Sequence, residues 1–465
     1  MQFQEAKDIL AKNGQSHILA FWDTLDDAQK DALLGQIEQL DFEIIAGMKS
    51  MLAERAAAAD GCAAKAGAAQ FAPAAVAELS GEELAEAERI GAAELRAGKV
   101  AAILVAGGQG SRLNYNGPKG CYPIGPVTNA PLFYFHARKM LALARRFGRP
   151  APFYVMTSPL NDEPTRAFFA ENSFFGLDEG DVFFFSQSMW PALDADGKIM
   201  LENPGNIFMS PDGHGGTLAA LERSGALADM KRRGIENVFF FQVDNPLVDV
   251  AAPAFIGFHK LRGADISMKV CAKRDPDEGL GAVVDYGGGR LGIVEYTEFT
   301  EEQKNERAPG GELRYKYGSV AIHVFSAAFL EREARAGLPV HIAHKSVECV
   351  DASGAVVAKP ENPNAFKFEK FIFDCLADAD AAVCLAFYRA QEFAPVKNAE
   401  KKDTPATCKA ALVAKWGQWL ASAGIPFKAG AAIEIDPAFA DSASELAEKI
   451  KDGLRIDPEA GVISL

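Results

Sequence analysis

The sequence predicts an α/β fold in which a mostly parallel sheet carries helices on both faces. From residue 100 to about 375, short apolar runs alternate with amphipathic segments, the pattern of strands joined by crossover helices. The chain has 465 residues, 49% of them hydrophobic, and is long enough for one large domain with smaller additions. We expect a helical N-terminal region with an alanine-rich linker at 1–98, a main domain at 99–400 and a small C-terminal module at 401–465.

The individual elements follow from hydrophobic periodicity. Leu33, Leu34 and Ile37 recur at helical spacing, whereas residues 56–80 are dominated by alanine and favour a linker or a solvated helix. In the main domain we expect strands at 101–105, 153–157, 182–185 and 238–243, and helices at 132–147, 163–172 and 218–232. A further helix is expected at 410–423 in the C-terminal module.

Charge and cysteine content limit the classes of function. The net charge of -15 disfavours a nucleic-acid partner, which needs a basic face, but allows a small anionic substrate bound by a few local cations. We find no signal peptide and no apolar run long enough to span a bilayer, so we expect no membrane partner. The seven cysteines form no Cys-x-x-Cys pair and predict reduced thiols in a cytoplasmic protein.

The most informative motif is a glycine loop. Residues 101–113 read Ala-Ala-Ile-Leu-Val-Ala-Gly-Gly-Gln-Gly-Ser-Arg-Leu, and residues 117–120 read Gly-Pro-Lys-Gly. Backbone N–H groups without Cβ obstruction can approach a phosphate or base, and Arg112 and Lys119 add two fixed cations. This arrangement suits a nucleoside triphosphate attacked at its α-phosphorus. The third glycine of a dinucleotide fingerprint is missing and no P-loop sequence occurs, which disfavours an NAD-type oxidoreductase.

Two further motifs carry candidate chemistry. Residues 239–246, Phe-Phe-Phe-Gln-Val-Asp-Asn-Pro, bring Asp244 to the carboxyl end of a strand, where it can hold Mg²⁺. An isolated aspartate there is more often a turn cap, and the glycine loop with Lys119 favours the metal. Residues 209–218 form a second glycine-dense loop that can approach a ribose or base. Its His214 does not indicate a serine hydrolase, because the chain contains no Gly-x-Ser-x-Gly sequence.

Together these motifs resemble one family. The resemblance is carried by residues 105–113, 118–120, 211–216, 243–245, 294–296, 366–371 and 395–398. In this order they resemble the eukaryotic-type UDP-sugar pyrophosphorylases, the UDPGP family, and within it most closely the UDP-N-acetylglucosamine pyrophosphorylases. The similarity extends from residue 14 to about 425. It implies a Rossmann-like nucleotidyltransferase fold, with the catalytic domain at 99–400, and UTP and a sugar 1-phosphate as substrates; it implies no protein partner.

The resemblance also assigns roles to residues. For UTP binding it implies the backbone of Val105, Ala106, Gly107 and Gly108 with Gln187 at the uracil, Gly213 near the nucleoside, and Lys367 at the phosphates. It implies Arg112, Lys119 and Lys397 as catalytic cations and Asp244 as the Mg²⁺ ligand. For the sugar it implies Gly281, Glu295 and Tyr296, with Phe371 and Phe373 shaping the pocket and His214 and Ser319 at positions that set specificity. An arbitrary lysine is more often a solvated surface charge, and only the motif context favours function for these lysines.

The implied reaction is in-line attack of a sugar 1-phosphate oxygen on the α-phosphorus of UTP, with pyrophosphate leaving. We expect N-acetylglucosamine 1-phosphate as the sugar substrate. Glucose or galactose 1-phosphate is the alternative, because His214 replaces an asparagine of the family pattern and Ser319 replaces another. A UDP-sugar-binding protein without catalysis is an alternative of another class. His341 and His344 lack partners at metal-ligand spacing and are expected to be structural or exposed.

Overall fold

The chain folds into two compact units. The computed structural model of the protein describes residues 1–60, 71–351, 353–457 and 459–465. The smaller unit consists of Met1–Gln70, Ser188–Gly216 and Leu338–Ile372, and the larger unit of Phe71–Gln187, Thr217–Gly337 and Phe373–Leu465. These units divide the chain at other places than the expected boundaries at 98 and 400. Residues 71–98 and the C-terminal segment pack with the larger unit, and two segments from the middle of the chain pack with the N-terminal helices.

A sheet organises the larger unit. In its described part the sheet has ten strands, in the order β1-β11-β13-β9-β2-β3-β4, with β10 and β12 pairing with β13 and β11, and β18 pairing with β10. The strands are β1 (Ala72–Pro73), β2 (Val100–Val105), β3 (Phe153–Thr157), β4 (Val182–Ser186), β9 (Asn237–Gln242), β10 (Ile266–Ala272), β11 (Ala282–Asp285), β12 (Leu291–Val294), β13 (Tyr317–Ser326) and β18 (Ala382–Ala386). A separate pair consists of β19 (Ala432–Glu434) and β20 (Val462–Ser464).

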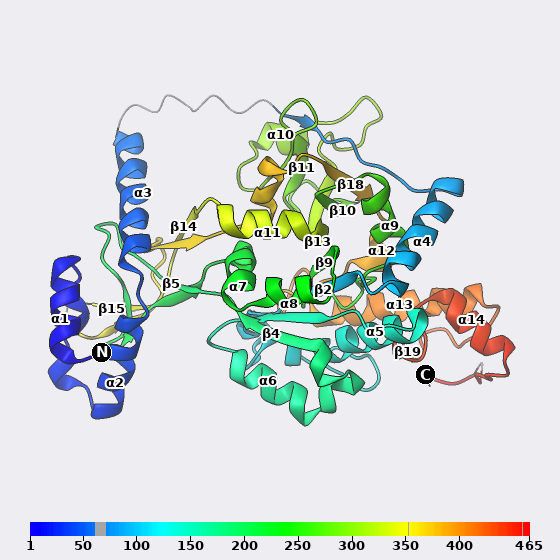
Figure 1. Cartoon of the computed structure of the whole chain (residues 1–465), viewed down its shortest axis with the longest axis horizontal. Helices are drawn as coiled ribbons and strands as arrows, with labels where there is room; N and C mark the ends of the chain where they lie inside the picture. The colour runs from blue at the N-terminus through cyan, green and yellow to red at the C-terminus, as the bar shows by residue number, and fades with distance from the viewer. Residues whose placement is uncertain (61–70, 352, 458) are drawn as a thin grey trace. The chain divides into compact units, whose positions relative to one another are not determined.

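The helices of this unit lie on both faces of the sheet (Figure 1). They are α4 (Gly81–Arg96), α5 (Leu132–Phe147), α6 (Asp162–Glu171), α7 (Thr217–Arg223), α8 (Ala226–Arg232), α9 (Pro253–Leu261), α10 (Glu301–Asn305), α11 (Ala327–Ala336), α12 (Arg389–Glu392), α13 (Pro405–Ser422) and α14 (Ala443–Lys451). Alternation along the strands sends neighbouring side chains to opposite faces. Phe239 and Phe241 of β9 pack in one core with Met140 of α5, whereas Tyr154 of β3 donates its hydroxyl to Asp229 of α8 (2.7 Å). Burial of both faces explains the continuous apolar runs of β2 and β9.

The predicted α/β fold is confirmed. The four strands expected from the sequence are β2, β3, β4 and β9, and they pair in parallel. The strands that the periodicity did not identify continue the sheet from β9 through β13, which runs antiparallel to its neighbours. The helix expected at 218–232 is wrong in one respect: it is two helices, α7 and α8. The helix is interrupted at Gly225, between α7 and α8. Its φ of 80° lies in the left-handed region, which an α-helix cannot contain.

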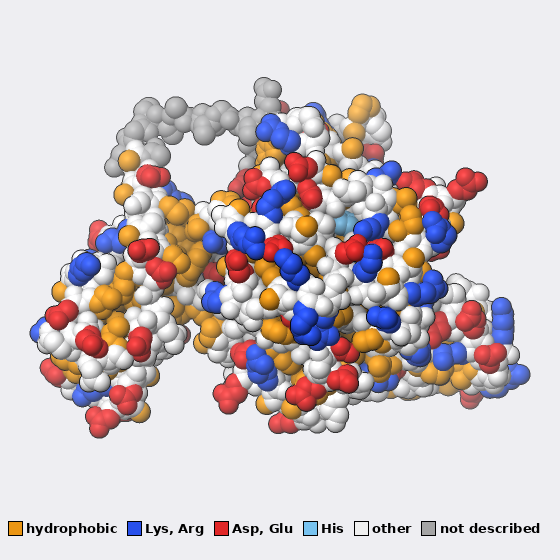
Figure 2. Space-filling view, viewed as in Figure 1, with side chains coloured by type: hydrophobic (Ala, Val, Ile, Leu, Met, Phe, Trp, Pro, Cys, Tyr) orange, Lys and Arg blue, Asp and Glu red, His pale blue; other side chains and the backbone are white. Residues whose placement is uncertain are grey.

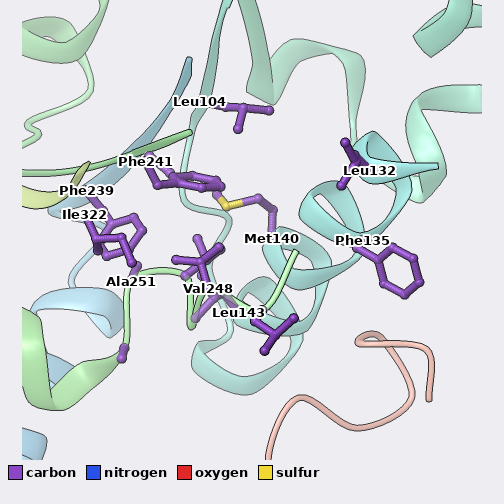
Figure 3. Packing of buried hydrophobic residues seen from close by; sticks show 14 of the residues in the cluster. Leu104, Leu132, Phe135, Met140, Leu143, Phe239, Phe241, Val248, Ala251 and Ile322 are labelled. Carbon is purple, nitrogen blue, oxygen red and sulfur yellow. The ribbon is translucent and has the colours of Figure 1, made fainter. Parts of the chain in front are cut away.

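The core beside the parallel strands also fixes the segment after β9. Figure 3 shows Met140 and Leu143 of α5 near Phe241 and Val248, all of them buried. Val248 lies in the loop that follows Asp244. Large-to-small substitutions in such a core commonly cost about 2–5 kcal/mol, so this packing holds the loop firmly against α5.

The C-terminal segment is tied to α5 by charge and by aromatic packing. Arg138 Nε donates to Asp436 Oδ1 (2.9 Å), and the Phe135 and Trp416 rings lie 6.1 Å apart. Buried Glu434 accepts hydrogen bonds from the backbone N of Val127 (2.7 Å) and of Thr128 (2.9 Å). The module predicted at 401–465 is therefore joined to the sheet-bearing unit by specific contacts.

The smaller unit buries the N-terminal helices against strands from the middle of the chain. It contains α1 (Phe3–Lys12), α2 (Asp27–Glu38), α3 (Phe42–Asp60), β5 (Met189–Pro191), β6 (Leu201–Asn203), β7 (Asn206–Ile207), β8 (Met209–Pro211), β14 (His341–Lys345), β15 (Cys349–Val350), β16 (Val356–Val357) and β17 (Ala365–Glu369). Leu33 and Ile37 of α2 share a core with Ile199 and Phe368. Fully buried Gln15 accepts from Ile199 N (2.9 Å). The alanine-rich stretch at 56–80 is helical to Asp60, and residues 61–70 lie outside the described part.

The visible surface of the larger unit mixes both charges. Figure 2 shows lysine and arginine side chains interspersed with aspartate and glutamate on the face in view. Many form short-range pairs, such as Arg89 with Glu86 (2.6 Å) and Arg166 with Asp162 (2.7 Å). No helix among the described residues combines the length and the apolar composition that crossing a membrane requires.

Helices α4 and α9 approach each other so closely that the contact requires glycine. A Cβ atom at Gly257 of α9 would lie 1.7 Å from the Ala87 carbonyl oxygen of α4. We expect Gly257→Ala to lower the free energy of unfolding of the larger unit by about 3 kcal/mol, because the two helix backbones would have to separate. Denaturant unfolding monitored by circular dichroism measures this. Gly310→Ala, at a position with nothing within 4 Å of the added Cβ, is the control. Equal midpoints for the two variants would contradict the close contact.

Candidate active site

The glycine loop after β2 is closed by hydrogen bonds to the segment that carries Lys119. The Gly108 carbonyl accepts from Lys119 N (3.1 Å), and Gly110 N donates to the Gly117 carbonyl (2.9 Å). Arg112 follows within the same loop, in the short helix η3 (Ser111–Leu113), and Lys119 begins η4 (Lys119–Cys121). The two predicted cations are thus presented by one folded loop.

Gln187, directly after β4, lies against this loop. A Cβ atom at Gly107 would come within 2.3 Å of Gln187 Nε2 and 3.1 Å of the Thr157 carbonyl oxygen. The Gln187 backbone N donates to the same Thr157 carbonyl (3.0 Å). The absence of a side chain at Gly107 is therefore what admits the glutamine amide. The structure brings together Gly107 and Gln187, which the resemblance assigned to one ligand group.

Two buried residues after β3 determine the direction of the loop peptides. Asn161 Nδ2 donates to the carbonyls of Ala106 (2.9 Å) and Gly108 (3.2 Å), and Ser158 Oγ donates to that of Gly107 (2.8 Å). A trans peptide directs its N–H opposite to its C=O, so the N–H groups that follow these carbonyls point to the other side of the loop. The loop therefore presents donors on the side away from Asn161.

Sequence reasoning assigned no role to Asn161. It precedes α6, where an asparagine normally signals a helix cap. Its side chain makes no capping bond and is used for the glycine loop. The only sequence signal for this role is its place shortly after Ser158, at the carboxyl end of a parallel strand.

The buried carboxylate of Asp244 is surrounded by several cations. Lys119 Nζ lies 3.2 Å from Asp244 Oδ2, and the two side chains are only 11% and 12% exposed. Burial opposes ionisation of Asp244, but the charges of Lys119, Lys397 and Arg112 and the Lys119 hydrogen bond outweigh it and lower its pKa below the usual 3.8. The structure thus brings together Asp244, Lys119, Lys397 and Arg112, four of the five charged residues that the resemblance assigned to phosphates and metal; the fifth, Lys367, belongs to the smaller unit.

Neighbouring groups fix the end of β9 that carries Asp244. His136 of α5 is fully buried and makes a hydrogen bond through Nε2 to the Val243 carbonyl (2.9 Å). Burial lowers the pKa of His136 to about 3, so the ring is neutral at pH 7 and its Nε2 donates. On the other side, the Asp244 carbonyl accepts from Val396 N (2.8 Å), which joins the strand end to the segment that carries Lys397.

The donor set fits one divalent cation shared with a ligand. Within the part of the chain that the structure describes, no group of three or more His, Cys, Asp or Glu side chains could hold a metal ion. Asp244 supplies one ionised carboxylate, a hard oxygen ligand of the kind that Mg²⁺ prefers. Mg²⁺ commonly takes its remaining ligands from water and substrate phosphates, so a single carboxylate among phosphate-binding cations is a suitable protein contribution.

The predicted sugar residues of the larger unit gather near Ile293 of β12. A Cβ atom at Gly281 would lie 2.4 Å from Ile293 Cγ2 and 3.1 Å from Glu295 Oε1, and the Gly281 carbonyl accepts from Ser319 N (2.9 Å). Phe373 and Ile293 line one surface hollow. Tyr296, 41% exposed, lies beside the same stretch of chain: its Cε1 is 3.6 Å from where a Cβ at Gly279 would stand. The structure thus brings Gly281, Glu295 and Ser319 together, and of the predicted sugar residues Phe373 lines the hollow.

The remaining predicted residues belong to the smaller unit. Gly213 has a left-handed φ of 84°, and a Cβ there would lie 2.5 Å from the Lys370 carbonyl oxygen, so glycine is required. His214 Nδ1 accepts from Ile372 N (3.1 Å), which leaves the ring hydrogen on Nε2 in the neutral form. The His214 and Phe371 rings lie 5.5 Å apart. His214 thus fixes the 371–372 backbone, a role that sequence reasoning did not foresee.

Lys367, His341 and His344 lie on the paired strands β14 and β17 of this unit. Lys367 Nζ lies 4.8 Å from the centre of the Phe208 ring, and burial lowers its pKa. His341 packs on Phe371 with ring centres 4.7 Å apart, and His344 stacks on Phe366 at 4.2 Å. His344 is exposed, and His341 is partly buried against Phe371.

Comparison with known proteins agrees with this geometry. A family model described as UTP–glucose-1-phosphate uridylyltransferase matches residues 60–425. UDP-N-acetylhexosamine pyrophosphorylase-like protein 1 of Homo sapiens is 37% identical over 446 residues, covering 91% of this chain and 86% of that protein. UDP-N-acetylglucosamine pyrophosphorylase of Saccharomyces cerevisiae is 31% identical over 461 residues, covering 93% and 94%. The crystal structure of the Trypanosoma brucei uridine diphosphate N-acetylglucosamine pyrophosphorylase matches with a TM-score of 0.82 at 27% identity, covering 99% and 98%. The chain belongs to the UDPGP family of uridylyltransferases.

Proposed function

We propose that the protein transfers the uridylyl group of UTP to N-acetylglucosamine 1-phosphate, forming UDP-N-acetylglucosamine and pyrophosphate. The observation that carries the proposal is the buried Asp244 among Lys119, Lys397 and Arg112, next to a glycine loop that presents backbone donors. Membership of the family and the names of the relatives support the uridylyl transfer and the acetamido sugar.

The reaction needs positioning and charge neutralisation rather than a covalent enzyme intermediate. An oxygen of the sugar phosphate forms a bond to the α-phosphorus of UTP, and the bond from this phosphorus to the oxygen bridging to the β-phosphate breaks. Negative charge grows on the transferring group and on the departing pyrophosphate. Arg112, Lys119 and Lys397 would stabilise this charge from fixed positions in a partly buried site.

Asp244 would hold Mg²⁺, because it supplies an ionised carboxylate oxygen beside the cations assigned to the phosphates. When bound, Mg²⁺ supplies positive charge to phosphate oxygens and orients them. The cluster of fixed charges around Asp244 keeps this carboxylate ionised in the neutral pH range, ready to accept a cation.

The uridine and sugar are assigned to the groups of residues described above. We assign the uracil to Gln187 and the donors of the glycine loop, with Gly213 near the nucleoside and Lys367 at a phosphate. We assign the sugar to Gly281, Glu295, Tyr296, Ser319 and Phe373, together with His214 and Phe371. Support comes from the close contacts of Gly107 with Gln187 and of Gly281 with Glu295 in the larger unit, and from the packing of His214 on Phe371 in the smaller unit. Glucose or galactose 1-phosphate is the second candidate substrate, since His214 and Ser319 replace amides with groups of different hydrogen-bonding pattern.

We further propose a cytoplasmic location. Cys121, Cys271, Cys349, Cys384 and Cys408 are thiols outside any disulfide, and Cys62 lies outside the described residues. Burial raises the pKa of the Cys384 thiol to about 12, which keeps it protonated and unreactive.

The substrate assignment is tested by pyrophosphate release. Purified protein with UTP and Mg²⁺ receives N-acetylglucosamine, N-acetylgalactosamine, glucose or galactose 1-phosphate in parallel. We expect kcat/KM to be highest for N-acetylglucosamine 1-phosphate. A higher kcat/KM for glucose or galactose 1-phosphate would indicate that His214 and Ser319, which replace asparagines of the family pattern, change the sugar specificity. Absence of release with every sugar would contradict the proposed function and favour a binding protein.

The cation cluster gives a second prediction. Lys119→Ala and Asp244→Ala should each lower kcat by about 10²–10³-fold, because each removes a preorganised charge at the reacting phosphates. Steady-state pyrophosphate release measures the effect, and circular dichroism checks the fold. Lys99→Ala is the control: Lys99 is paired with Glu236 (2.7 Å) at an exposed site and should leave kcat unchanged. A turnover near that of the wild type in either cluster variant would remove that residue from the mechanism.

The contact between Gly107 and Gln187 gives a third prediction. Gly107→Ala should raise the KM for UTP by about 10-fold or more, because the new methyl group displaces the Gln187 amide that is assigned to the uracil. Gln187→Ala should raise the same KM, and the double variant should be no worse than the poorer single variant, since both act through one contact. Gly310→Ala serves again as the control. Additive losses would show that the two residues act on UTP separately.

A further inference from the structure

Two loops of the larger unit, one carrying a predicted sugar residue and the other a predicted phosphate cation, are joined by ion pairs. The first, the 273–281 loop, joins β10 to β11 and carries Gly281. The second, the 393–404 segment, joins α12 to α13 and carries Lys397. Neither loop was given a connecting role by the sequence, because their residues are far apart in the chain.

Arg274 of the 273–281 loop bridges two carboxylates. Its Nε donates to Glu278 Oε1 (2.9 Å) in its own loop, and its Nη2 donates to Asp403 Oδ1 (3.0 Å) in the 393–404 segment. The Glu278 side chain is only 5% exposed and also accepts from Arg389 Nη2 (2.8 Å) and from Arg274 N (2.7 Å). Arg274 is therefore anchored at Glu278 and reaches out to Asp403.

Asp403 in turn holds the backbone of Lys397. Its carbonyl accepts from Lys397 N (2.7 Å) and from Asn398 N (3.2 Å). Asp403 has a left-handed φ of 54°, an uncommon conformation for a residue other than glycine that its surroundings must maintain. On the other side, Ala399 N donates to the Arg112 carbonyl (3.0 Å). The 393–404 segment is thus hydrogen-bonded to the glycine loop through Ala399 and to Arg274 through Asp403.

We propose that Arg274 is a positioning residue that holds Lys397 in register with the 273–281 loop and its sugar residue Gly281. The proposal rests on the proposed function. Arg274 touches neither reacting phosphate; it acts through Asp403, whose backbone carries Lys397. Its loss should therefore affect steps that need the sugar 1-phosphate and Lys397 together, and should leave binding of UTP alone nearly unchanged.

Two features separate this role from an ordinary surface charge. The guanidinium fork satisfies two carboxylates in fixed directions, which a lysine ammonium on a flexible stem does not reproduce. A second ion pair joins the same two loops: Lys402 with Asp275 at 3.4 Å, with 61% and 41% of the side chains exposed. Such an exposed ion pair contributes little to stability. Removing Lys402 therefore controls for the loss of a positive charge between the same two loops.

The fold should tolerate removal of the Arg274 side chain. This side chain is 42% exposed, and Arg389 continues to compensate the charge of Glu278 when Arg274 is truncated. Asp403→Asn retains a residue type that adopts positive φ and removes only the carboxylate charge. Both variants therefore test the link rather than the stability of the unit.

The experiment compares Arg274→Ala, Arg274→Lys, Asp403→Asn and the double variant Arg274→Ala/Asp403→Asn with the control Lys402→Ala. We expect about 10-fold lower kcat/KM for the sugar 1-phosphate in the first three, a size typical of coupling between sites, with the KM for UTP within about twofold of wild type. The double variant should lose no more than Arg274→Ala, and Arg274→Lys should not rescue. Additive losses, rescue by lysine, an equal loss in Lys402→Ala, wild-type kinetics in Arg274→Ala or a matching rise in the KM for UTP would overturn the proposal.

A binding measurement separates this inference from the proposed function. Calorimetry on the same full-length variants compares UDP-N-acetylglucosamine with UDP. Arg274→Ala should weaken binding of the UDP-sugar by about 10-fold and leave UDP unchanged, whether or not the wild type turns over. If the wild type releases no pyrophosphate but shows this difference, the proposed function fails and the positioning role stands. Equal effects on both ligands, or no binding of the UDP-sugar by the wild type, would overturn the positioning role.

Discussion

The ionised, buried carboxylate of Asp244 is the constraint on which the rest of the larger unit depends. Removing an aspartate from water costs several kcal/mol unless opposite charge compensates it. The compensation comes from Lys119 and Arg112 of the glycine loop and from Lys397 near the C-terminal segment. Two segments that are distant in sequence from β9 and from each other must therefore converge at its end. The same positive charge that keeps Asp244 ionised is suited to a triphosphate.

The convergence is maintained by backbone contacts as well as by charge. Asn245 Nδ2 donates to the Glu392 carbonyl (2.7 Å), and Asn245 Oδ1 accepts from Ala394 N (3.1 Å). Glu392 itself pairs with Lys269, which is 4% exposed. Breaking such a buried pair by removing one partner is strongly destabilising. The segment leading to Lys397 is therefore held by the residue directly after Asp244, and the C-terminal part of the chain contributes to the site as well as to packing.

The glycine loop shows how buried polar residues shape a ligand site from behind. Asn161 and Ser158 donate hydrogen bonds to the carbonyl oxygens of the loop. These bonds also satisfy the buried polar groups of the two side chains. The donors of the loop are consequently directed to the opposite side without a ligand being present. Preorganised donors of this kind need not reorient when charge develops, which is how they contribute most to catalysis.

Much of this protein was determined by the sequence alone. The four parallel strands and the loop after β2 that carries Arg112 and Lys119 could be predicted, because apolar periodicity and glycine spacing are local properties. The break between α7 and α8, the antiparallel half of the sheet and the grouping of residues 188–216 with the N-terminal helices could not. They depend on packing between distant segments. The links of Asn161 to the glycine loop and of Arg274 to Asp403 were decided only by the tertiary structure, because each joins residues whose partners are set by the fold and not by neighbours in the chain.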